Sequence, residues 1–376
     1  DFVTALDYSE ISKRFYENLP PLPDVTLVAE TKAHPAILDA FPGPKRVTWA
    51  KFLDFACKPI PQPEAKIREG STVAHLSFYL AQFLGCDPIC FVGQDLGFSD
   101  GLYYFPGLAM HDVWAPELSP FNTLEMLEWQ RIARHRGHLS KQTDVHGRSI
   151  YSDEQMMTYL KQFERDFATA EQTIIDCTEG GMPKDHTVRL PLQEALDQYA
   201  RQPVGELPVP DTALDADRLA QATGLIERRI EELDELARTT RATVPLLRDM
   251  QKHQGDQRKM DQLFKRLNRN QAKVHGELGP VFHMVSHLNT VGHFKRSRAD
   301  RRIHNAELDD LGKQAQQLER DIENLEWLLQ AGEALRRMMV DAAERCRAFK
   351  PHTVSHTTHT TAQPEPSDAT ASTQAA

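Results

Sequence analysis

The sequence predicts an α/β fold with a doubly wound parallel sheet, followed by an all-α helical region. Apolar runs typical of strands alternate with helical patterns over residues 1–200, which is the pattern of a doubly wound sheet. Further along, apolar residues spaced by three and four indicate long helices that pack on one another. A proline-bearing stretch separates the two patterns. We therefore expect an α/β domain at 1–200, a linker at 201–212, a helical bundle or coiled coil at 213–348 and a disordered tail, rich in Thr, Ser, Ala and Pro, at 349–376.

The first elements follow from apolar runs and from the prolines that end them. The chain opens on a strand that ends near Asp7 and reads as already under way, so we expect an earlier strand to precede it. A helix is expected at 8–19, because apolar residues recur there every four positions and prolines follow. Next come a strand at 25–29, a short helix that ends near residue 40 and a strand at 46–49.

The stretch from 70 to 95 contains a complete loop, helix, strand and turn. The helix is expected at 73–84, ended by Gly85 in the left-handed conformation. A buried parallel strand is expected at 89–92, because its residues are all apolar. Gly93-Gln94-Asp95 then leaves the carboxyl end of this strand, where ligands bind in open α/β sheets.

This stretch carries the first candidate site. Ser71 and Thr72 place hydroxyls and free backbone N–H groups at a helix N-terminus, which suits an anion. Gly93 would let a backbone approach closely, and Asp95 would place a carboxylate where it could hold a sugar hydroxyl or an amine. The structural alternative is that Ser71 only caps the helix and Asp95 only caps the next turn.

A second polar turn follows a strand expected at 173–177. Gly180 and Gly181 would free the backbone to bend toward a ligand, and Glu179 would lie at the same sheet edge as Asp95. The alternative is a turn whose glutamate caps the next helix. His186, just past the turn, is a further candidate for proton transfer.

Two segments between these turns are open to two interpretations. The aromatic-rich segment 102–119 is either a packed surface loop or a lid over a bound sugar. A helix at 122–137 carries several arginines, which form either a solvated face or a rim that attracts an anionic ligand. A further helix is expected at 153–170.

Composition argues against several classes of protein. The net charge of −10 argues against a general nucleic-acid binder. No apolar run approaches the length of a membrane span, so no membrane is expected as a partner. The five cysteines lack metal-type spacing, and we expect buried free thiols, Cys86 and Cys90 among them, in a reducing, cytoplasmic compartment.

Several motifs occur in a specific order along residues 1–200. The main ones are Gly70-Ser71-Thr72-Val73-Ala74, Leu84-Gly85-Cys86-Asp87-Pro88-Ile89, Gly93-Gln94-Asp95-Leu96 and Thr178-Glu179-Gly180-Gly181. They resemble the central domain of the motility accessory factor (Maf) family, which is also labelled 6-hydroxymethylpterin diphosphokinase MptE-like. The order of loop, helix, strand and Gly-x-Asp turn is also distantly similar to that of sialyltransferases that use CMP-sialic acid.

This resemblance implies a Rossmann-like sheet, truncated at its N-terminus, because an earlier strand and a glycine-rich turn complete the nucleotide site in the family. It implies a glycosyltransferase that moves a nonulosonic, sialic-acid-like sugar from a CMP donor to Ser or Thr of flagellin, with no metal and no cofactor beyond the donor. The implied nucleotide- or sugar-binding residues are Ser71, Thr72, Gly93, Asp95, Tyr103, Gly180 and Gly181.

The catalytic roles are implied in the same way. Glu179 would act as the general base, with His186 as the second choice, and the Tyr103 hydroxyl would stabilise the leaving phosphate. The sequence departs from the family at Tyr103-Tyr104, where many members have a Thr-His pair. The role of that histidine therefore cannot be carried over to Tyr104.

Two other functions stay open. A pterin pyrophosphokinase would need Mg²⁺, ATP and the convergence of Asp95, Asp100 and Glu179. A scaffold protein would use the sheet only to support the helical region. The expected partners are a nucleotide sugar, flagellin or another protein acceptor, and a second copy of the chain through the helical region.

Overall fold

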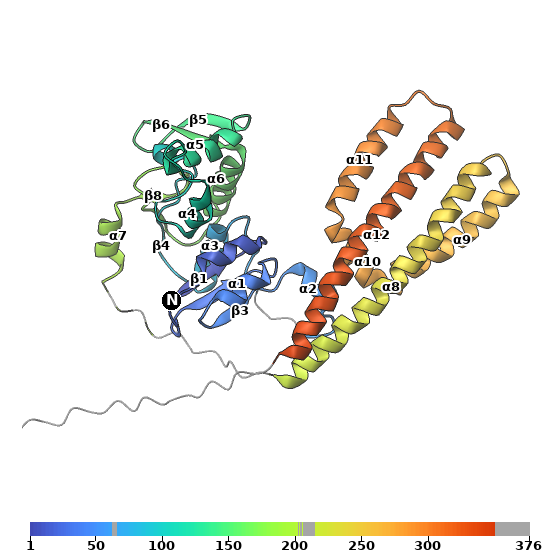
Figure 1. Ribbon diagram of the computed structural model, residues 1–376, viewed down its shortest axis with the longest axis horizontal. Coiled ribbons are helices and arrows are strands. Elements are labelled where there is room, and N and C mark those ends of the chain that lie inside the picture. Colours follow the sequence, from blue (N-terminus) through green and yellow to red (C-terminus); the bar gives the residue numbers. More distant parts are fainter. Residues whose placement is uncertain (62–65, 202, 204, 206–214, 350–376) are drawn as a thin grey trace, which may run out of the picture. The chain divides into compact units, whose positions relative to one another are not determined.

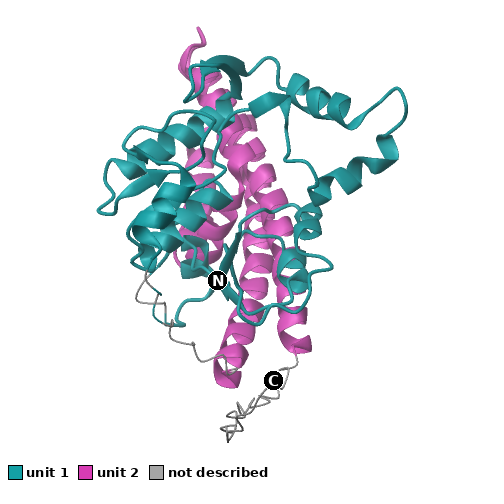
Figure 2. Ribbon diagram, turned by 90° about the vertical axis from the view of Figure 1, so that its left-hand side faces the viewer, with its two compact units in different colours: residues 1–211 teal, residues 212–376 magenta. Residues whose placement is uncertain are grey.

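A computed structural model describes residues 1–61, 66–201, 203, 205 and 215–349. The chain divides into two compact units, residues 1–211 and 212–376 (Figure 2). Most of the expected linker, and the expected disordered tail from residue 350 onward, lie outside the described residues.

The α/β unit begins with a three-stranded parallel sheet in the order β1-β2-β3 (Figure 1). Its interior contains Leu27, Ile37 and Phe41, each almost fully buried. The expected helix at 8–19 is a shorter 3-10 helix, because the Asp7 carboxylate accepts hydrogen bonds from Ser9 N–H and from the Ser12 hydroxyl and tightens the turn. The elements are β1 (Phe2–Ala5), η1 (Glu10–Phe15), β2 (Thr26–Ala29), α1 (Pro35–Ala40), β3 (Lys45–Val47) and α2 (Lys51–Ala56).

A second parallel sheet has the order β4-β7-β8. Its strands are β4 (Ile89–Phe91), β7 (Ile174–Asp176) and β8 (Val188–Arg189), and the helices α3 (Val73–Phe83) and α6 (Glu154–Phe167) pack on β4 and β7 through a cluster of aromatic rings. The expectation that Cys86 and Cys90 are buried is wrong, because both are exposed. Cys90 points to the strand face opposite Ile89 and Phe91, which are the residues that enter the core.

The two sheets have the strand orders of the two halves of a Rossmann fold, 3-2-1 and 4-5-6. Helix α3 contacts both β1 and β4, and therefore joins the halves. The predicted fold class is confirmed, with the parallel strands divided into two small sheets. The remaining elements of this unit are η2 (Ser99–Gly101), α4 (Ala109–Trp114), η3 (Ala115–Glu117), α5 (Leu124–Arg134), the antiparallel hairpin of β5 (Leu139–Thr143) and β6 (Ser149–Asp153), and α7 (Leu192–Tyr199).

The second unit is helical, as the spacing of its apolar residues predicts. Its longest helices run antiparallel, because Glu227 near the start of one pairs with Arg347 at the end of the other. Val244, Met250 and Leu318 belong to the core between them. The helices are α8 (Ala216–Lys252), α9 (Gln257–His275), α10 (Gly279–Leu288), α11 (Thr290–His304) and α12 (Asp310–Ala348). Within the described ranges, no helix is both long and apolar enough to cross a bilayer.

Candidate functional site

The loop at 70–72 is fixed to the carboxyl end of β2. Glu30, the buried residue that follows β2, accepts the Gly70 N–H at 2.6 Å. Its other carboxylate oxygen pairs with Lys32 Nζ at 2.9 Å, and Lys32 also donates to the Gly70 carbonyl at 3.0 Å. The loop therefore lies at the sheet edge where ligands bind in this kind of fold.

Thr72 is the N-cap of α3, and a buried histidine holds its hydroxyl. Thr72 Oγ1 accepts the His75 N–H at 3.3 Å and lies 2.8 Å from His75 Nδ1. The His75 ring has no exposed surface and stacks on Phe163 with centroids 3.7 Å apart. Burial lowers the pKa of His75 to about 4, so the ring is neutral at physiological pH.

Ser71 begins a chain of hydrogen bonds that leads into the protein. Its hydroxyl donates to Gln162 Oε1, and Gln162 Nε2 donates to the Tyr79 hydroxyl at 3.1 Å. Tyr79 donates to the buried Asp166 carboxylate, which also pairs with Arg68 at 2.9 Å. Burial, assisted by Asp166, raises the pKa of Tyr79 to about 12. The network fixes Gln162, and Gln162 orients the Ser71 hydroxyl.

Two cations lie beside this loop, although the chain is acidic as a whole. The Lys32 side chain is 46% exposed and that of Arg68 is 62% exposed. Together with the Ser71 hydroxyl and the first N–H groups of α3, they form an edge suited to a phosphate or carboxylate. Neither cation was predicted from the sequence. Lys32 reaches the loop from the residues after β2, and spacing along the chain does not reveal that approach.

The second candidate turn meets Asp95 through its backbone. The Met182 N–H donates to the Asp95 carbonyl at 2.7 Å, and a Cβ on Gly181 would lie 2.3 Å from Asp95 Cα. Gly181 also has a φ of +68°. The sequence therefore predicted correctly that these two turns meet. No part of the protein packs closely on Gly93, because a Cβ there would meet nothing within 4 Å, and its φ of +69° is what requires a glycine. Its approach to a ligand stays a prediction.

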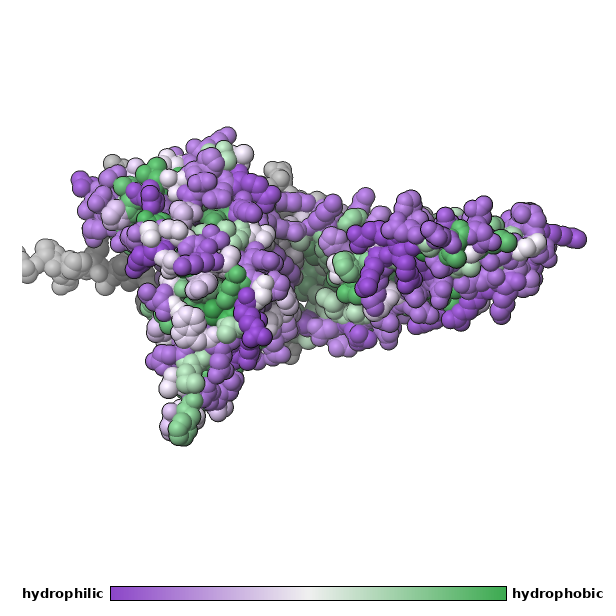
Figure 3. All heavy atoms as spheres, turned by 90° about the horizontal axis from the view of Figure 1, so that it is seen from above, coloured by the Kyte–Doolittle hydropathy of each residue, from purple (hydrophilic) through white to green (hydrophobic). Residues whose placement is uncertain are grey.

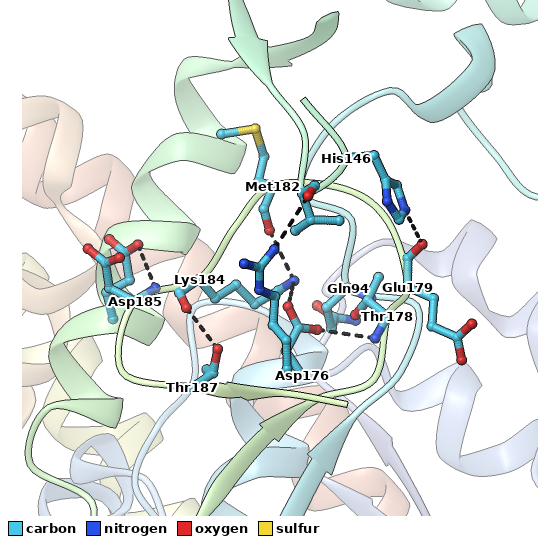
Figure 4. Close-up of polar contacts among 12 residues, drawn as sticks. Gln94, His146, Asp176, Thr178, Glu179, Met182, Lys184, Asp185 and Thr187 are labelled. Carbon is cyan, nitrogen blue, oxygen red and sulfur yellow. Dashed lines mark hydrogen bonds and ion pairs between the residues drawn. The ribbon is translucent and has the colours of Figure 1, made fainter. Parts of the chain in front are cut away.

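We call the contact between the 178–183 turn and Asp95 the joint. A buried ion pair that was not predicted from the sequence lies beside it. Asp176, at the end of β7, pairs with Lys184 Nζ at 2.9 Å, and both side chains are almost fully buried (Figure 4). Lys184 also donates to the Met182 carbonyl, and Asp176 accepts the Thr178 N–H. Burial raises the pKa of Asp95, with a further contribution from Asp176 and an opposing one from Lys184.

Glu179 points away from this pair (Figure 4). Its carboxylate accepts the Leu192 N–H at 2.9 Å, at the start of α7, and its backbone carbonyl lies 2.9 Å from His146 Nε2. The helix-capping alternative therefore describes the contact that Glu179 makes in this structure. Gly180, the next residue, is close to the Asp95 carboxylate: a Cβ on Gly180 would lie 3.6 Å from Asp95 Oδ1.

His186 lies elsewhere. It is exposed and lines a shallow depression with residues of α6, including Lys161 and Arg165. Glu179 and His186 thus contact different neighbours.

Tyr103 belongs to a packed aromatic segment. Its backbone N–H, and that of Tyr104 at 3.0 Å, donate to the buried Glu128 carboxylate of α5. His111 Nε2 lies 2.8 Å from the same carboxylate. The Tyr103 ring stacks on Phe98, and burial raises its pKa. Helix α4 of this segment contacts η1, so the segment reaches the residues that follow β1.

Metal-ligating side chains do not gather within the described parts of the chain. No group of three or more His, Cys, Asp or Glu residues is arranged there to hold a metal ion. Asp95 lies within electrostatic range of Asp100 and Asp176, but Asp176 is neutralised by Lys184.

The sheet order and this edge define a Rossmann-like α/β domain with a polar, cation-flanked loop at the carboxyl ends of its strands. Residues 1–101 match the family model described as 6-hydroxymethylpterin diphosphokinase MptE-like. The predicted resemblance to the MptE-like family is thereby confirmed for this segment.

The other comparisons are more distant. No curated protein matches the chain. A solved structure, that of a Maf glycosyltransferase from Magnetospirillum magneticum AMB-1, is 14% identical with a TM-score of 0.37. The alignment covers 87% of this chain and 45% of the other, so the chain spans less than half the length of that protein.

Proposed function

We propose that this chain is a glycosyltransferase that transfers a nonulosonic sugar from a CMP donor to Ser or Thr of a protein acceptor such as flagellin. The observation that carries the proposal is the 70–72 loop, where a serine hydroxyl, a capped helix N-terminus and two partly exposed cations form one edge. An anionic nucleotide is the kind of ligand that such an edge attracts. The proposed reaction class is that of the Maf family, which the motifs of residues 1–200 resemble.

In this proposal the phosphate of the donor binds at the loop. Ser71 would turn its hydroxyl from Gln162 to the phosphate, and the first N–H groups of α3 would donate to it as well. Lys32 and Arg68 would add positive charge beside it. Thr72 would keep the helix end in place. Asp95, with the backbone of Gly93, Gly180 and Gly181, would contact the ribose or the sugar.

Transfer requires that the acceptor hydroxyl lose a proton and attack the anomeric carbon, while the bond from the sugar to the phosphate breaks and CMP leaves with the electron pair. Glu179 is the proposed base, and it would have to release or share its contact with Leu192 to act. His186 is the second choice. The Tyr103 hydroxyl would donate to the departing phosphate, so the proposed reaction needs no metal.

A second function, pyrophosphoryl transfer to a pterin, has one observation in its favour, which is the description of the matching family model. It would require ATP with Mg²⁺, and acidic ligands near Asp95. A titration with CMP and with ATP distinguishes this function from the glycosyltransferase.

The test is calorimetric titration of the whole protein with CMP and with ATP, each with and without Mg²⁺. The proposal expects CMP to bind equally well with and without Mg²⁺, and expects Ser71→Ala to weaken binding about tenfold to a hundredfold by removing one hydrogen bond to a charged group. Ser297→Ala, an exposed serine of α11, is the matched control and should bind like the parent. Binding of ATP only with Mg²⁺ would favour the pterin kinase. The absence of binding to either nucleotide would overturn both proposals.

A further inference from the structure

The helical unit contains a groove of about 410 Å³ whose walls come from five helices. The antiparallel pair α8 and α12 forms its floor, with Leu247 and Leu328 buried there. α9 and α11 lie on the two outer sides of that pair (Figure 1), and α10 contributes Phe282.

The residues that line the groove have the spacing by which helices pack on one another. Those of α9 are Leu267, Asn270, Gln271, Val274 and His275, and those of α12 are Asp321, Asn324, Leu325 and Leu328. In both helices the steps between successive lining residues are three or one, which is the face that a helix presents to a neighbouring helix in a bundle. The groove therefore has the lining of a bundle position that no helix of the described chain occupies.

The two flanking helices have an unusual charge. α9 carries six Lys or Arg against one Asp, and α11 carries five against one Asp, although the whole chain has a net charge of −10. Arg266 of α9 and Arg301 of α11 are exposed, and neither forms an ion pair within the described ranges. Figure 3 shows hydrophobic patches between hydrophilic surfaces on this unit. Leucines of the floor, at 247, 325 and 328, together with the positive net charge of α9 and α11, favour an occupant that has an apolar stripe with acidic residues beside it.

We propose that this groove binds an acidic amphipathic helix of a partner protein. The leucines and valine of the floor and walls would take the apolar stripe of that helix, as in other helix-in-groove complexes. The carboxamides of Asn270, Gln271 and Asn324 would bond to polar groups at the edges of the stripe. Cations of α9 and α11 would pair with acidic residues on either side. The inference does not depend on the transferase proposal, because every residue that it uses belongs to the helical unit.

The test uses the whole protein and a labelled synthetic helical peptide of about 18 residues, with leucines at i, i+3, i+4 and i+7 and glutamates elsewhere. Fluorescence anisotropy should show binding that weakens at high salt. A peptide with lysines in place of the glutamates should bind at least about tenfold more weakly.

Two variants locate the binding to the groove. Val274→Glu places a charge in the wall and should abolish binding, whereas Ala272→Glu, on the exposed outer face of the same helix, should change it little. Gln271→Glu is nearly isosteric at an exposed lining position, so it keeps the fold and should weaken binding about threefold to tenfold. Unfolding midpoints of all three variants show whether each is folded.

Four outcomes of the binding measurements would overturn the inference. They are no binding of the acidic peptide at about 100 μM, equal binding of the acidic and basic peptides, insensitivity to both groove variants, or tighter binding of a nucleic-acid duplex than of the peptide. A protein that dimerises through the groove would also overturn it. In that case Val274→Glu would convert dimer to monomer in analytical ultracentrifugation, and the occupant would be a second copy of the chain.

Discussion

The loop at 70–72 and the turn at 178–183 both place glycine beside polar residues at the carboxyl end of a parallel strand, but they differ in structure. In the loop, Ser71 is exposed beside two partly exposed cations. In the turn, the polar groups satisfy one another: Lys184 neutralises Asp176, Gly181 packs on Asp95 and Glu179 caps α7. The cations of the loop also have carboxylate partners, but their side chains stay partly exposed, whereas Lys184 and Asp176 are almost fully buried. We therefore expect a ligand to bind at the loop, and we expect the turn to act first as a structural joint.

The largest effect is expected from breaking the buried pair of the joint. Lys184→Met would leave the Asp176 carboxylate buried without its cation, and should lower the free energy of unfolding by about 3–5 kcal/mol. Chemical denaturation of the whole protein, followed for the α/β unit, measures this. Replacing both residues, as in Lys184→Met with Asp176→Leu, should recover much of the loss. A cost under about 1 kcal/mol for the single variant would contradict the structural role of the joint.

A smaller effect is expected from the glycine that packs on Asp95. Gly181→Ala combines a positive φ with a Cβ only 2.3 Å from Asp95 Cα, and should cost about 3 kcal/mol. Gly93→Ala is the matched control. It has almost the same φ but open space around its Cβ, so the cost should be about 1 kcal/mol. Equal losses in the two variants would show that close packing at Gly181 contributes nothing.

The next effect is a loss of stability in acid, which comes from His75, the buried histidine that holds the Thr72 hydroxyl. Burial depresses the pKa of His75 from 6.5 to about 4, so the unfolded state binds a proton first as the pH falls. The stability that comes from the neutral ring is complete above about pH 7. It should fall by about 2 kcal/mol on reaching pH 5 and continue to fall through pH 4. The free energy of unfolding should be measured against pH for the parent and for His75→Phe. The parent should show this fall between about pH 7 and pH 4, and the variant should lack it.

The smallest effect on stability is expected at the loop itself. Ser71→Ala removes an exposed hydroxyl and should change the free energy of unfolding by no more than about 0.5 kcal/mol. Combined with the expected loss of CMP binding, this would separate a ligand-binding loop from a structural joint. A loss of stability above about 2 kcal/mol would show that Ser71 is itself a structural residue, and the contrast between the two turns would fail.

The alternation of strands and helices, and the stripes of the long helices, could be predicted from the sequence because they depend on local spacing. The helix after Thr72, the left-handed Gly85 and the strand at 89–91 are all present. The 3-10 form of η1 was missed because it depends on the side chain of Asp7. Exposure of Cys90 was missed because an apolar run of this kind does not show that one face of the strand is uncovered.

The sequence by itself determined the α/β class, the helical second unit and the loop and turns at the carboxyl ends of the strands, since each is a property of neighbouring residues. Tertiary structure alone decided what those turns do. Lys32 and Gln162 reach the 70–72 loop from other elements, Asp166 of α6 pairs with Arg68 just before the loop, and Lys184 reaches Asp176 across the turn. The same folding directs the Glu179 carboxylate to α7. Burial and charge pairing depend on residues brought together from distant parts of the chain, and spacing along the sequence does not encode them.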